Sequence, residues 1–561
     1  MSLRALLKPV LPNLPQSAAG DELQILREVP VESLYLALKE ADGEVVEWFF
    51  NAAAPRQVQG IVDLDCWTGA EFQPERFEPY FRQLTNLGPA KLADYMKKLD
   101  PEIVSRALLE YAEVLDFDPQ EPPAYPERQI LLTPDSKYAL ILRTDDPETR
   151  EMLFQFLNRM SAGDIDHLRR MLETLKWEQK SDLEEFAYNV KKGRLEEMGF
   201  VDYHDAIGLY ARGNARGLRT EMLENPLSPG TKTAVYARGE SAPAGDDDEA
   251  AGLVEEARLQ TDFLPVQMSA PLNEEGFFRE SLAKVADPKL REVVLGEFVR
   301  ALNVALSAER MLQGRLEDIA ICTLRSRRYI DLGLAWLADK NAERGAELLD
   351  SQRIEQVLRL GWLLVQDMVQ GRNELLKLLP AADHAQLDRE ILESLQGRHP
   401  RLDSRTLTDL GVPKEHVANL SAAAVPNLES LLLLGLRLQQ LGVMARFLKE
   451  QMGESLKLDA EPRPVGQGAY ARLVAGLFRQ ATGAAFSPAG LSEEEWQTLS
   501  PKLDANAVAK LVALVSGRCP DPARVLLAKR LAATFEDLSF QIRNNPSRRP
   551  DARYLSDIAL A

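Results

Sequence analysis

The sequence predicts an all-α protein, in which an N-terminal superhelical array of helix pairs carries one small β-hairpin and is followed by a larger C-terminal helical domain. Two observations predict this class. Leu, Ala, Glu and Arg dominate while aromatic residues make up only 7% of the chain, a balance typical of helices because these side chains lose little rotamer freedom there. Apolar residues also recur at helical spacing through most of the 561 residues. A chain of this length predicts about three or four domains.

One helical phrase occurs twice near the N-terminus, in residues 34–50 and 92–108. Each copy reads as a helix, an acidic break and a second helix, and the breaks are Asp42-Gly43-Glu44 and Asp100-Pro101-Glu102. Asp100 before Pro101 is typical of an N-cap followed by the first helical residue. The offset of about 58 residues falls in the range of stacked helical repeats, which build surfaces for partners. We therefore expect a helical platform in this part of the chain.

A β-hairpin is expected to interrupt the helices. Residues 119–126 contain four prolines and cannot be helical. Beyond them, apolar residues 130–132 and 138–142 flank the turn-forming sequence Thr133-Pro134-Asp135-Ser136. This pattern predicts a hairpin near residues 129–143, which must pack on the helices or on a partner because a lone hairpin is only marginally stable.

The segment 225–252 predicts a linker, since it contains prolines, glycines and little apolar periodicity. It includes Asp246-Asp247-Asp248-Glu249, and consecutive carboxylates of this kind can bind a hard cation. No ligand pattern of the calcium-loop type follows them, so we favour a solvated linker.

Helix start signals recur in the C-terminal part. Asp287-Pro288 precedes a long amphipathic stretch, and Ser492 stands at capping-box spacing from Glu495. Further helices are expected around residues 330–338, 354–369, 428–448, 505–515 and 522–539.

The expected organisation combines these boundaries. It consists of a flexible lead-in (1–25), the helical array (26–224), the linker (225–252), a C-terminal helical domain (253–545) with a subdomain or insertion (380–426), and an arginine-containing tail (546–561).

The formal net charge of −19 restricts the partners. Such a field repels phosphate backbones and anionic membranes, so we expect no nucleic acid and favour proteins or cations as partners. Pro9, Pro12 and Pro15 interrupt any signal-peptide core, and the most apolar run, residues 431–436, is far shorter than the roughly 20 residues of a membrane span. We therefore expect a cytoplasmic protein without a membrane span.

The three cysteines, Cys66, Cys322 and Cys519, lie far apart in the sequence. No Cys-x-x-Cys pair occurs, so neither a zinc site of that type nor a disulfide framework is predicted. We expect three partly buried thiols in a reducing cytoplasm. No cofactor and no metal site follows from the sequence.

His204 and Asp205 are the candidate catalytic residues. In this stretch His204 stands between Asp202 and Asp205, and a histidine beside carboxylates is a common acid–base group. The same stretch also reads as a helix start that is capped by Asp202, with Tyr210 on the inner face. We favour the structural interpretation, because no nucleophile accompanies the histidine.

Arg325, Arg327 and Arg328 are the candidate anion-binding residues. On a helix they would form one positive patch in an acidic protein, able to hold a phosphate or a partner's acidic surface. Ion pairing with nearby acids is the alternative that we favour. These acids are Glu317, Asp318 and Asp331.

Several motifs of known chemistry are absent from the sequence. No G-x-x-x-x-G-K or G-x-S-x-G sequence occurs, and Gly466-Gln467-Gly468 lacks the third glycine of a dinucleotide-binding loop. The sequence therefore favours a non-enzymatic protein-interaction scaffold or regulatory adaptor. The alternative is an enzyme, or a sensor of a divalent cation or phosphate ligand, whose site is assembled from residues distant in sequence.

The helix pairs with their D-G-E and D-P-E breaks, over residues 30–220, resemble the short superhelical modules at the N-terminus of MgtE-type magnesium transporters, and they also resemble the related flagellar motor-switch domains. Together with the hairpin segment LLTPDSKYALIL, the segment GFVDYHDAIGLY and the acidic linker, the whole chain is similar to a group of long bacterial proteins carrying a domain of unknown function. That resemblance implies a bacterial, cytoplasmic and mainly α-helical protein, and it brings no activity and no site residues.

Overall fold

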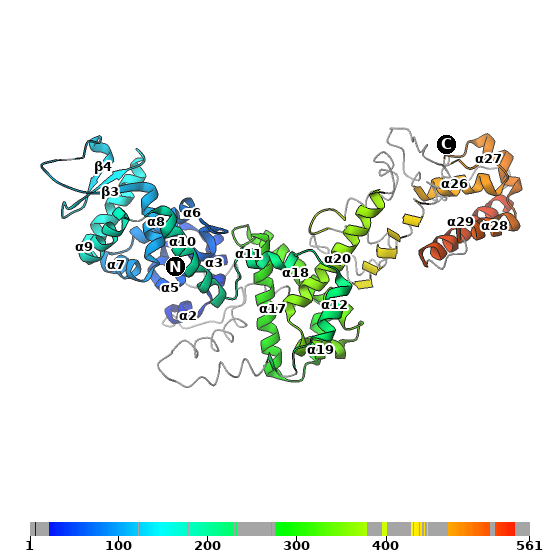
Figure 1. Ribbon diagram of the computed structural model, residues 1–561, viewed down its shortest axis with the longest axis horizontal. Coiled ribbons are helices and arrows are strands. Elements are labelled where there is room, and N and C mark those ends of the chain that lie inside the picture. The colour runs from blue at the N-terminus through cyan, green and yellow to red at the C-terminus, as the bar shows by residue number, and fades with distance from the viewer. Residues whose placement is uncertain are drawn as a thin grey trace. The chain divides into compact units, whose positions relative to one another are not determined.

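The chain forms two compact units in the computed structural model (Figure 1), one made of residues 1–212 and 219–359, the other of residues 213–218 and 360–561. The structure describes residues 22–121, 123–177, 179–228, 231–232, 275–377, 395–400, 469–487, 489–516 and 522–544, with single positions and runs of two or three residues elsewhere. Most of them are helical, and two small sheets of two and three strands accompany the helices. The predicted fold class is confirmed.

The first unit contains most of the described elements. Its helices are α2 (Glu22–Glu28), α3 (Val31–Lys39), α4 (Gly43–Ala52), α5 (Pro55–Asp65), α6 (Pro74–Thr85), α7 (Pro89–Lys98), α8 (Pro101–Tyr111), α9 (Pro147–Trp177), α10 (Lys180–Glu197), α11 (Tyr203–Ala206), α16 (Phe277–Lys284), α17 (Pro288–Glu309), α18 (Leu316–Leu337) and α19 (Ala342–Ser351), with 3-10 turns at Glu127–Gln129 and Ile207–Tyr210. Helices α12 (Ala215–Glu224) and α20 (Ile354–Lys377) contribute residues to both units.

The two similar phrases fold as α3–α4 and α7–α8, and their acidic breaks are helix caps. The Asp42 carboxylate accepts a hydrogen bond from the backbone N–H of Val45 at 3.0 Å, and Asp100 accepts one from Glu102 at 3.3 Å. Each aspartate satisfies an N–H that the first helical turn leaves free. Their positions were readable from the sequence because capping is a local interaction.

The predicted hairpin is present as β4 (Ile130–Leu132) and β5 (Tyr138–Leu142), which pair antiparallel with Leu131 opposite Leu140. A third strand, β3 (Ala112–Asp116), was not predicted and pairs with the other edge of β5. All five residues of β5 are buried, so this central strand requires cover on both edges and both faces. In the sheet, whose strand order is β3-β5-β4, the third strand supplies packing that a lone hairpin would lack.

A second, smaller hairpin also escaped prediction. Strands β1 (Trp67–Thr68) and β2 (Glu71–Phe72) pair antiparallel, and Gly69 between them has a φ of 63°. Glycine adopts this left-handed conformation without the Cβ clash of other residues, so it suits the turn. The hairpin directly follows α5 and brings Trp67 against Phe72, with ring centroids 5.4 Å apart.

The loop between α17 and α18 packs on the N-terminal helices. The Tyr35 hydroxyl of α3 donates a hydrogen bond to the Leu312 carbonyl at 2.7 Å, and Lys39 Nζ donates to the Gly314 carbonyl at 2.9 Å. In return, the Gln313 side chain donates to the Leu64 carbonyl of α5 at 2.8 Å. Segments nearly 300 residues apart in sequence therefore belong to one compact unit.

The division into compact units differs from the expected division at 225–252. The first unit continues to residue 359, and the start of the expected linker packs within it. Lys232 is buried, and its Nζ contacts Glu297 at 2.7 Å and the carbonyls of Leu349 and Gln352 at 2.8 and 2.6 Å. The backbone N–H of Leu227 also donates to the Ser351 carbonyl.

The second unit contains α26 (Ala469–Ala481), α27 (Glu493–Leu499), a 3-10 turn (Ser500–Lys502), α28 (Ala505–Ser516) and α29 (Pro522–Asn544). The capping box predicted at Ser492 is present, since Ser492 Oγ accepts from the Glu495 N–H at 3.2 Å while Glu495 accepts from the Ser492 N–H at 3.0 Å. The rings of Phe478 and Trp496 stack at 5.1 Å in the core.

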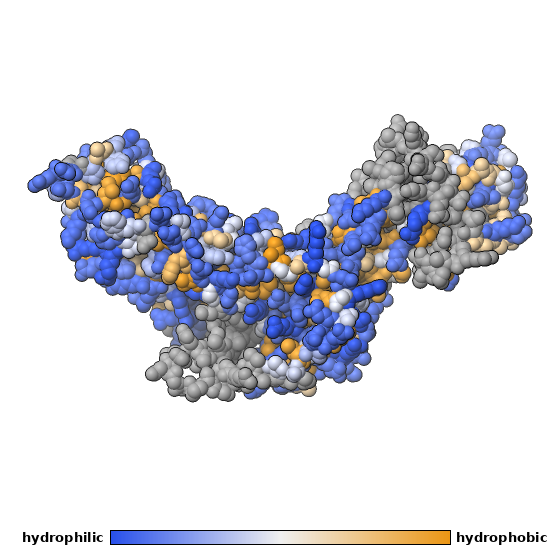
Figure 2. Space-filling view, in the orientation of Figure 1, coloured by the Kyte–Doolittle hydropathy of each residue, from blue (hydrophilic) through white to orange (hydrophobic). Residues whose placement is uncertain are grey.

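Several expectations fall on residues outside those described. They concern most of the lead-in 1–25 (of which residues 22–25 begin α2), the linker from 233 to 252, the stretch 401–426 and part of 380–400, and the tail 546–561. In Figure 2 the visible surface of the described residues is largely hydrophilic, with a hydrophobic area over the region of β3 and β4. None of the described helices is long and apolar enough to cross a membrane.

Candidate functional site

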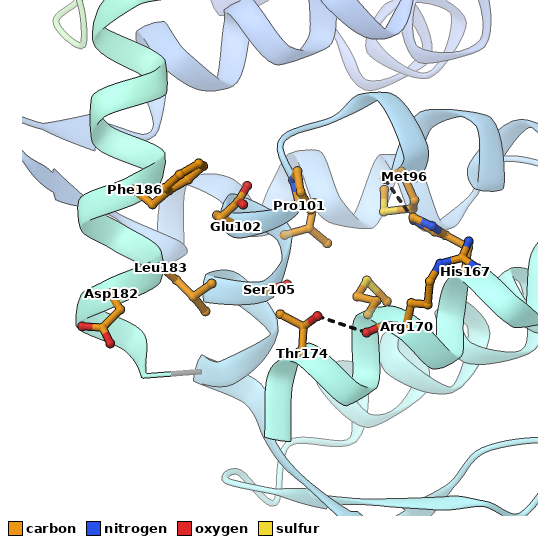
Figure 3. Close-up of a pocket in the computed structure, with 12 residues that line it drawn as sticks. Met96, Pro101, Glu102, Ser105, His167, Arg170, Thr174, Asp182, Leu183 and Phe186 are labelled. Carbon is orange, nitrogen blue, oxygen red and sulfur yellow. Dashed lines mark hydrogen bonds between the residues drawn. The ribbon is translucent and has the colours of Figure 1, made fainter. Parts of the chain in front are cut away.

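A groove of about 440 Å³ lies among helices α7, α8, α9 and α10 of the first unit (Figure 3). We call it the α8–α10 groove. Its lining residues are Met96, Pro101, Glu102, Val104, Ser105, His167, Arg170, Met171, Thr174, Asp182, Leu183 and Phe186. The volume falls within the range of about 300–1,000 Å³ that ligand-binding pockets occupy.

A break in α9 shapes one wall of the groove. Asp164 has non-helical angles (φ −158°, ψ 91°), and its carboxylate accepts a hydrogen bond from the backbone N–H of His167 at 2.9 Å, so it caps the second half of the helix. Lys97 Nζ lies 2.6 Å from the same carboxylate. Hydrogen bonding from Lys97, together with the His167 N–H, lowers the pKa of Asp164 to about 2. The carboxylate is therefore ionised at neutral pH and fixes the direction of the helix.

Next to the break, Gly163 lets α9 approach the start of α7 closely. A Cβ at this position would lie 2.3 Å from the Pro89 carbonyl oxygen at the start of α7. The two helices approach so closely that only glycine fits. Beside this contact, a ring nitrogen of His167 lies 3.3 Å from the Met96 carbonyl oxygen, as the dashed line in Figure 3 shows.

The acidic end of the groove comes from the second acidic break. Burial, followed by hydrogen bonding to Asp100, raises the pKa of Glu102 to about 7. Asp100 itself is buried and lies 3.0 Å from Arg194 of α10. Glu102 can therefore exchange a proton near neutral pH, and in its ionised form it can accept hydrogen bonds from a cationic group.

The apolar end of the groove comes from α10. Figure 3 shows the side chains of Leu183 and Phe186 extending from α10 toward α8. Leu183 is buried, but the phenyl ring of Phe186 keeps 56% of its surface exposed. Val190, one helical turn further along the same face, is also exposed. Large apolar side chains that stay in water beside a pocket are typical of a binding surface.

A second cavity of about 480 Å³ lies beside α3, α5 and α6. Here the Tyr80 hydroxyl donates to the Asp65 carboxylate at 2.8 Å, and the Tyr35 hydroxyl oxygen lies 2.8 Å from the same carboxylate, so that its one proton is shared between Asp65 and the Leu312 carbonyl. Burial, followed by the charge of Asp65, raises the pKa of both tyrosines far above the usual value, and burial lowers the pKa of Lys39. The tyrosines therefore keep their protons at neutral pH and act as donors, not as general bases.

His204 and Asp205 lie at the start of α11, where both side chains are exposed. The His204 N–H donates to the Asp202 carboxylate at 2.9 Å, and Asp205 pairs with Lys192 at 2.7 Å. Asp202 is thus the helix cap that the favoured structural interpretation predicts. Neither candidate lines the α8–α10 groove or the cavity at Asp65.

The three arginines of α18, Arg325, Arg327 and Arg328, are buried, and the first two form ion pairs. Arg325 pairs with Glu309, and Arg327 pairs with Asp331 while it lies 5.1 Å from the Phe278 ring. Asp331 is one of the acids that the sequence suggested as partners, whereas Glu309 is not. The cluster belongs to the interior of the unit and does not form a positive patch on its surface.

Among the described residues, Cys66 and Cys322 are buried free thiols, and burial raises the pKa of each. The described part of the chain contains no group of three or more His, Cys, Asp or Glu side chains that could hold a metal ion. Cys519 and the acidic run at 246–249 lie outside the described part of the chain.

Sequence reasoning overlooked Phe186, Asp65 and Lys191. Lys191 is a buried lysine of α10, and Phe186 occupies a position that reads as one more apolar residue of an amphipathic helix. Asp65 is the last residue of α5. The only sequence signal near it is Gly69, which marks a turn four residues later. Only the packing of distant helices distinguishes these residues from ordinary surface or core positions.

Comparison with known proteins adds a family to this description. Residues 18–561 match a family described as "Family of unknown function (DUF6178)". The chain belongs to this family. No curated protein and no solved structure matches the sequence. The expected membership of a family with a domain of unknown function is confirmed, and the comparisons show no likeness of this DUF6178 protein to MgtE-type or motor-switch modules.

Proposed function

We propose that this DUF6178 protein is a non-enzymatic, cytoplasmic interaction scaffold or regulatory adaptor that holds a segment of a partner protein in the α8–α10 groove. The observation that carries the proposal is the exposed phenyl ring of Phe186 beside the groove. Burying a side chain of this size contributes about 1.5–3 kcal/mol, and interfaces concentrate their binding energy in such anchors.

The apolar lining suits a bulky side chain of the partner. Val104 is buried in the wall, and Met96 and Met171 contribute flexible thioether side chains. Methionines adapt their shape to different occupants, which makes them common at protein-binding surfaces. The groove therefore fits an amphipathic helix or short peptide that inserts one or two large apolar residues.

The polar rim gives the partner segment a direction. Glu102 and Asp182 line the groove from α8 and α10, whereas Arg170 and His167 line it from α9. Complementary charges at a rim select the orientation of a partner more than they add affinity. We expect basic residues of the partner near Glu102 and Asp182, consistent with the strongly acidic net charge of the chain.

The test compares two variants in a pull-down from native cell lysate. Phe186→Glu places a charge on the groove, and Phe154→Glu places the same charge at another exposed phenylalanine, which is 46% exposed on α9 and does not line the groove. Wild type and Phe154→Glu should recover the same stoichiometric partner, and Phe186→Glu should lose it. Recovery of that partner by all three proteins would refute the proposed groove.

A second candidate function is a ligand sensor that uses the cavity at Asp65. In this cavity Lys39, Arg76 and the two tyrosines line the same space as the Asp65 carboxylate. Such a polar lining favours a small polar ligand. A thermal-shift screen with magnesium, calcium, zinc and nucleotides tests this candidate. A ligand-specific rise in Tm that Tyr80→Phe abolishes would support it, and a flat response would reject it.

A further inference from the structure

A small cavity of about 60 Å³ lies where α10, the β1–β2 hairpin and the end of α17 meet. It is separate from the α8–α10 groove and from the cavity at Asp65, and all its lining residues belong to the first unit. The residues that matter here are Lys191, Trp67, Gly69, Arg310, Asp63 and Asp202.

Lys191 is buried there with few partners for its charge. Its side chain is 4% exposed, and Nζ donates one long hydrogen bond, 3.3 Å, to the Gly69 carbonyl. The ammonium also lies over the rings of Trp67 and Tyr188, at 4.6 and 5.3 Å from their centroids. It forms no ion pair within 4 Å in the described part of the chain. An ammonium has three N–H donors, so its burial with one acceptor is costly.

Two further donors line the same cavity. Trp67 is 2% exposed, and its indole Nε1–H has no hydrogen-bond partner among the described residues. The guanidinium of Arg310 lies 3.9 Å from the centroid of the Tyr203 ring, and a Cβ on Gly69 would be 3.8 Å from Arg310 Nη2. Gly69 therefore lies next to both Lys191 and Arg310. Buried donors in folded proteins are almost always paired, with protein atoms, with ordered water or with a bound ion, so the Trp67 N–H has room for an acceptor from outside the chain.

The two carboxylates of the cavity are already engaged. Asp63 forms two hydrogen bonds with Arg194, at 2.7 and 3.0 Å. Asp202 caps α11 and also receives a hydrogen bond from the Tyr188 hydroxyl. Arg194 is shared between Asp63 and Asp100 and does not line the cavity. Of the charged lining residues, Lys191 and Arg310 equal the two carboxylates in number, and neither forms an ion pair within 4 Å with them in the described part of the chain.

We propose that this cavity binds a small oxyanion of phosphate size, which accepts hydrogen bonds from Lys191, the Trp67 indole and Arg310. The volume holds an anion of a few heavy atoms, and Arg310, which is exposed, leaves the cavity open on its side. An oxyanion offers several acceptor oxygens, which the Lys191 ammonium and the Trp67 N–H both need, and a negative charge, which balances that of the lysine. This site does not depend on the proposed groove, because no residue is shared between them.

Calorimetric titration of the full chain with inorganic phosphate at pH 7, at ionic strength fixed with chloride, tests the site. Lys191→Met removes the charge and keeps the aliphatic bulk, and Trp67→Phe removes only the indole donor and part of the ring. Each variant should weaken phosphate binding by at least about tenfold, the effect of losing one charge-assisted hydrogen bond. Lys192→Met and Trp177→Phe are matched controls at exposed positions and should bind as the wild type does.

Two results would overturn the proposal: no phosphate binding by the wild type, or equal binding by the wild type and both cavity variants. Thermal unfolding in chloride shows whether each variant is folded, so a folding defect cannot pass for a binding defect. A parallel titration with glycerol 3-phosphate distinguishes the sources of the anion. Tighter binding of the ester assigns the site to the phosphoryl group of a larger ligand, and tighter binding of phosphate assigns it to the free anion; either supports the site.

Discussion

The guanidinium of Arg194 binds the fully buried carboxylate of Asp63 through two hydrogen bonds, at 2.7 and 3.0 Å. Arg194 also lies 3.0 Å from Asp100, so one side chain of α10 neutralises carboxylates from α5 and α8. Gln59 completes the network, because it donates to Asp63 and accepts from the Asp100 N–H. The network joins the wall of the α8–α10 groove to the helices behind it.

Arg194→Met should destabilise the first unit by about 3–5 kcal/mol, since it leaves two buried carboxylates without their cation. Urea denaturation followed by circular dichroism measures the change. Arg128→Ala, which removes an exposed partner of Asp145, serves as the control and should cost less than about 1 kcal/mol. A cost for Arg194→Met as small as the control would show that the network does not contribute to stability.

Gly163→Ala should destabilise the first unit by about 1–3 kcal/mol, because the added Cβ overlaps the Pro89 carbonyl and forces α7 and α9 apart. Gly193→Ala in α10 provides the opposite control. No atom lies within 4 Å of a Cβ at Gly193, so alanine there should stabilise the helix by up to about 1 kcal/mol. Thermal unfolding of both variants checks the pair, and a stable Gly163→Ala protein would contradict the close approach.

Lys191→Met should stabilise the protein at pH 7 in phosphate-free buffer. Burial lowers the pKa of Lys191 to about 8 in the folded state, so the unfolded chain binds this proton more tightly. Stability should therefore rise with pH between about 8 and 10.5 in the wild type and not in the variant. The variant's advantage should be about 1–3 kcal/mol at pH 7 and should shrink across that window. Urea titrations at several pH values measure it, and a difference that is constant with pH would contradict the assignment to Lys191.

Glu495→Gln should weaken the second unit in a pH-dependent manner. Hydrogen bonds from Arg479 and from the Ser492 N–H lower the pKa of Glu495 to about 2. The stability from this carboxylate is thus complete above its usual pKa and is lost as the pH falls from about 5 to 2. Since Glu495 is partly exposed, we expect about 1 kcal/mol at pH 7 and almost none near pH 2.

Hydrogen exchange of peptides covering residues 479–499 checks this pH dependence, with Glu494→Gln as the neighbouring exposed control. Faster exchange in Glu495→Gln at pH 7 that converges with the wild type at low pH is the expected result. Identical exchange at every pH would contradict it.

Local signals in the sequence were sufficient for the elements that depend on neighbouring residues. The caps at Asp100 and Ser492 follow from hydrogen bonds to backbone N–H groups two or three residues further along the chain, and the hairpin around Thr133 pairs residues that are 7 to 11 positions apart. Strand β3 was missed because it follows α8 directly, and only its pairing with the buried strand β5 makes it a strand.

The candidate sites depend on distant contacts, and the sequence therefore gave little indication of them. The α8–α10 groove is lined by residues of four helices, α7, α8, α9 and α10, and only their packing brings these residues together. His204 attracted attention through its acidic neighbours, yet these neighbours cap a helix and pair with Lys192. Lys191 has no distinctive neighbours along the chain, and the cavity around it forms only when α10 packs against the end of α17.

The hydrogen bond from Tyr35 to the Leu312 carbonyl spans 277 residues of chain. A ribosome that adds about 5–20 residues per second needs roughly 15–55 seconds to synthesise this interval. During that time the nascent helices near Tyr35 lack the loop that later covers them, and their apolar surface is exposed to the cell. The N-terminal half is therefore the part of this chain for which we expect chaperone assistance during synthesis.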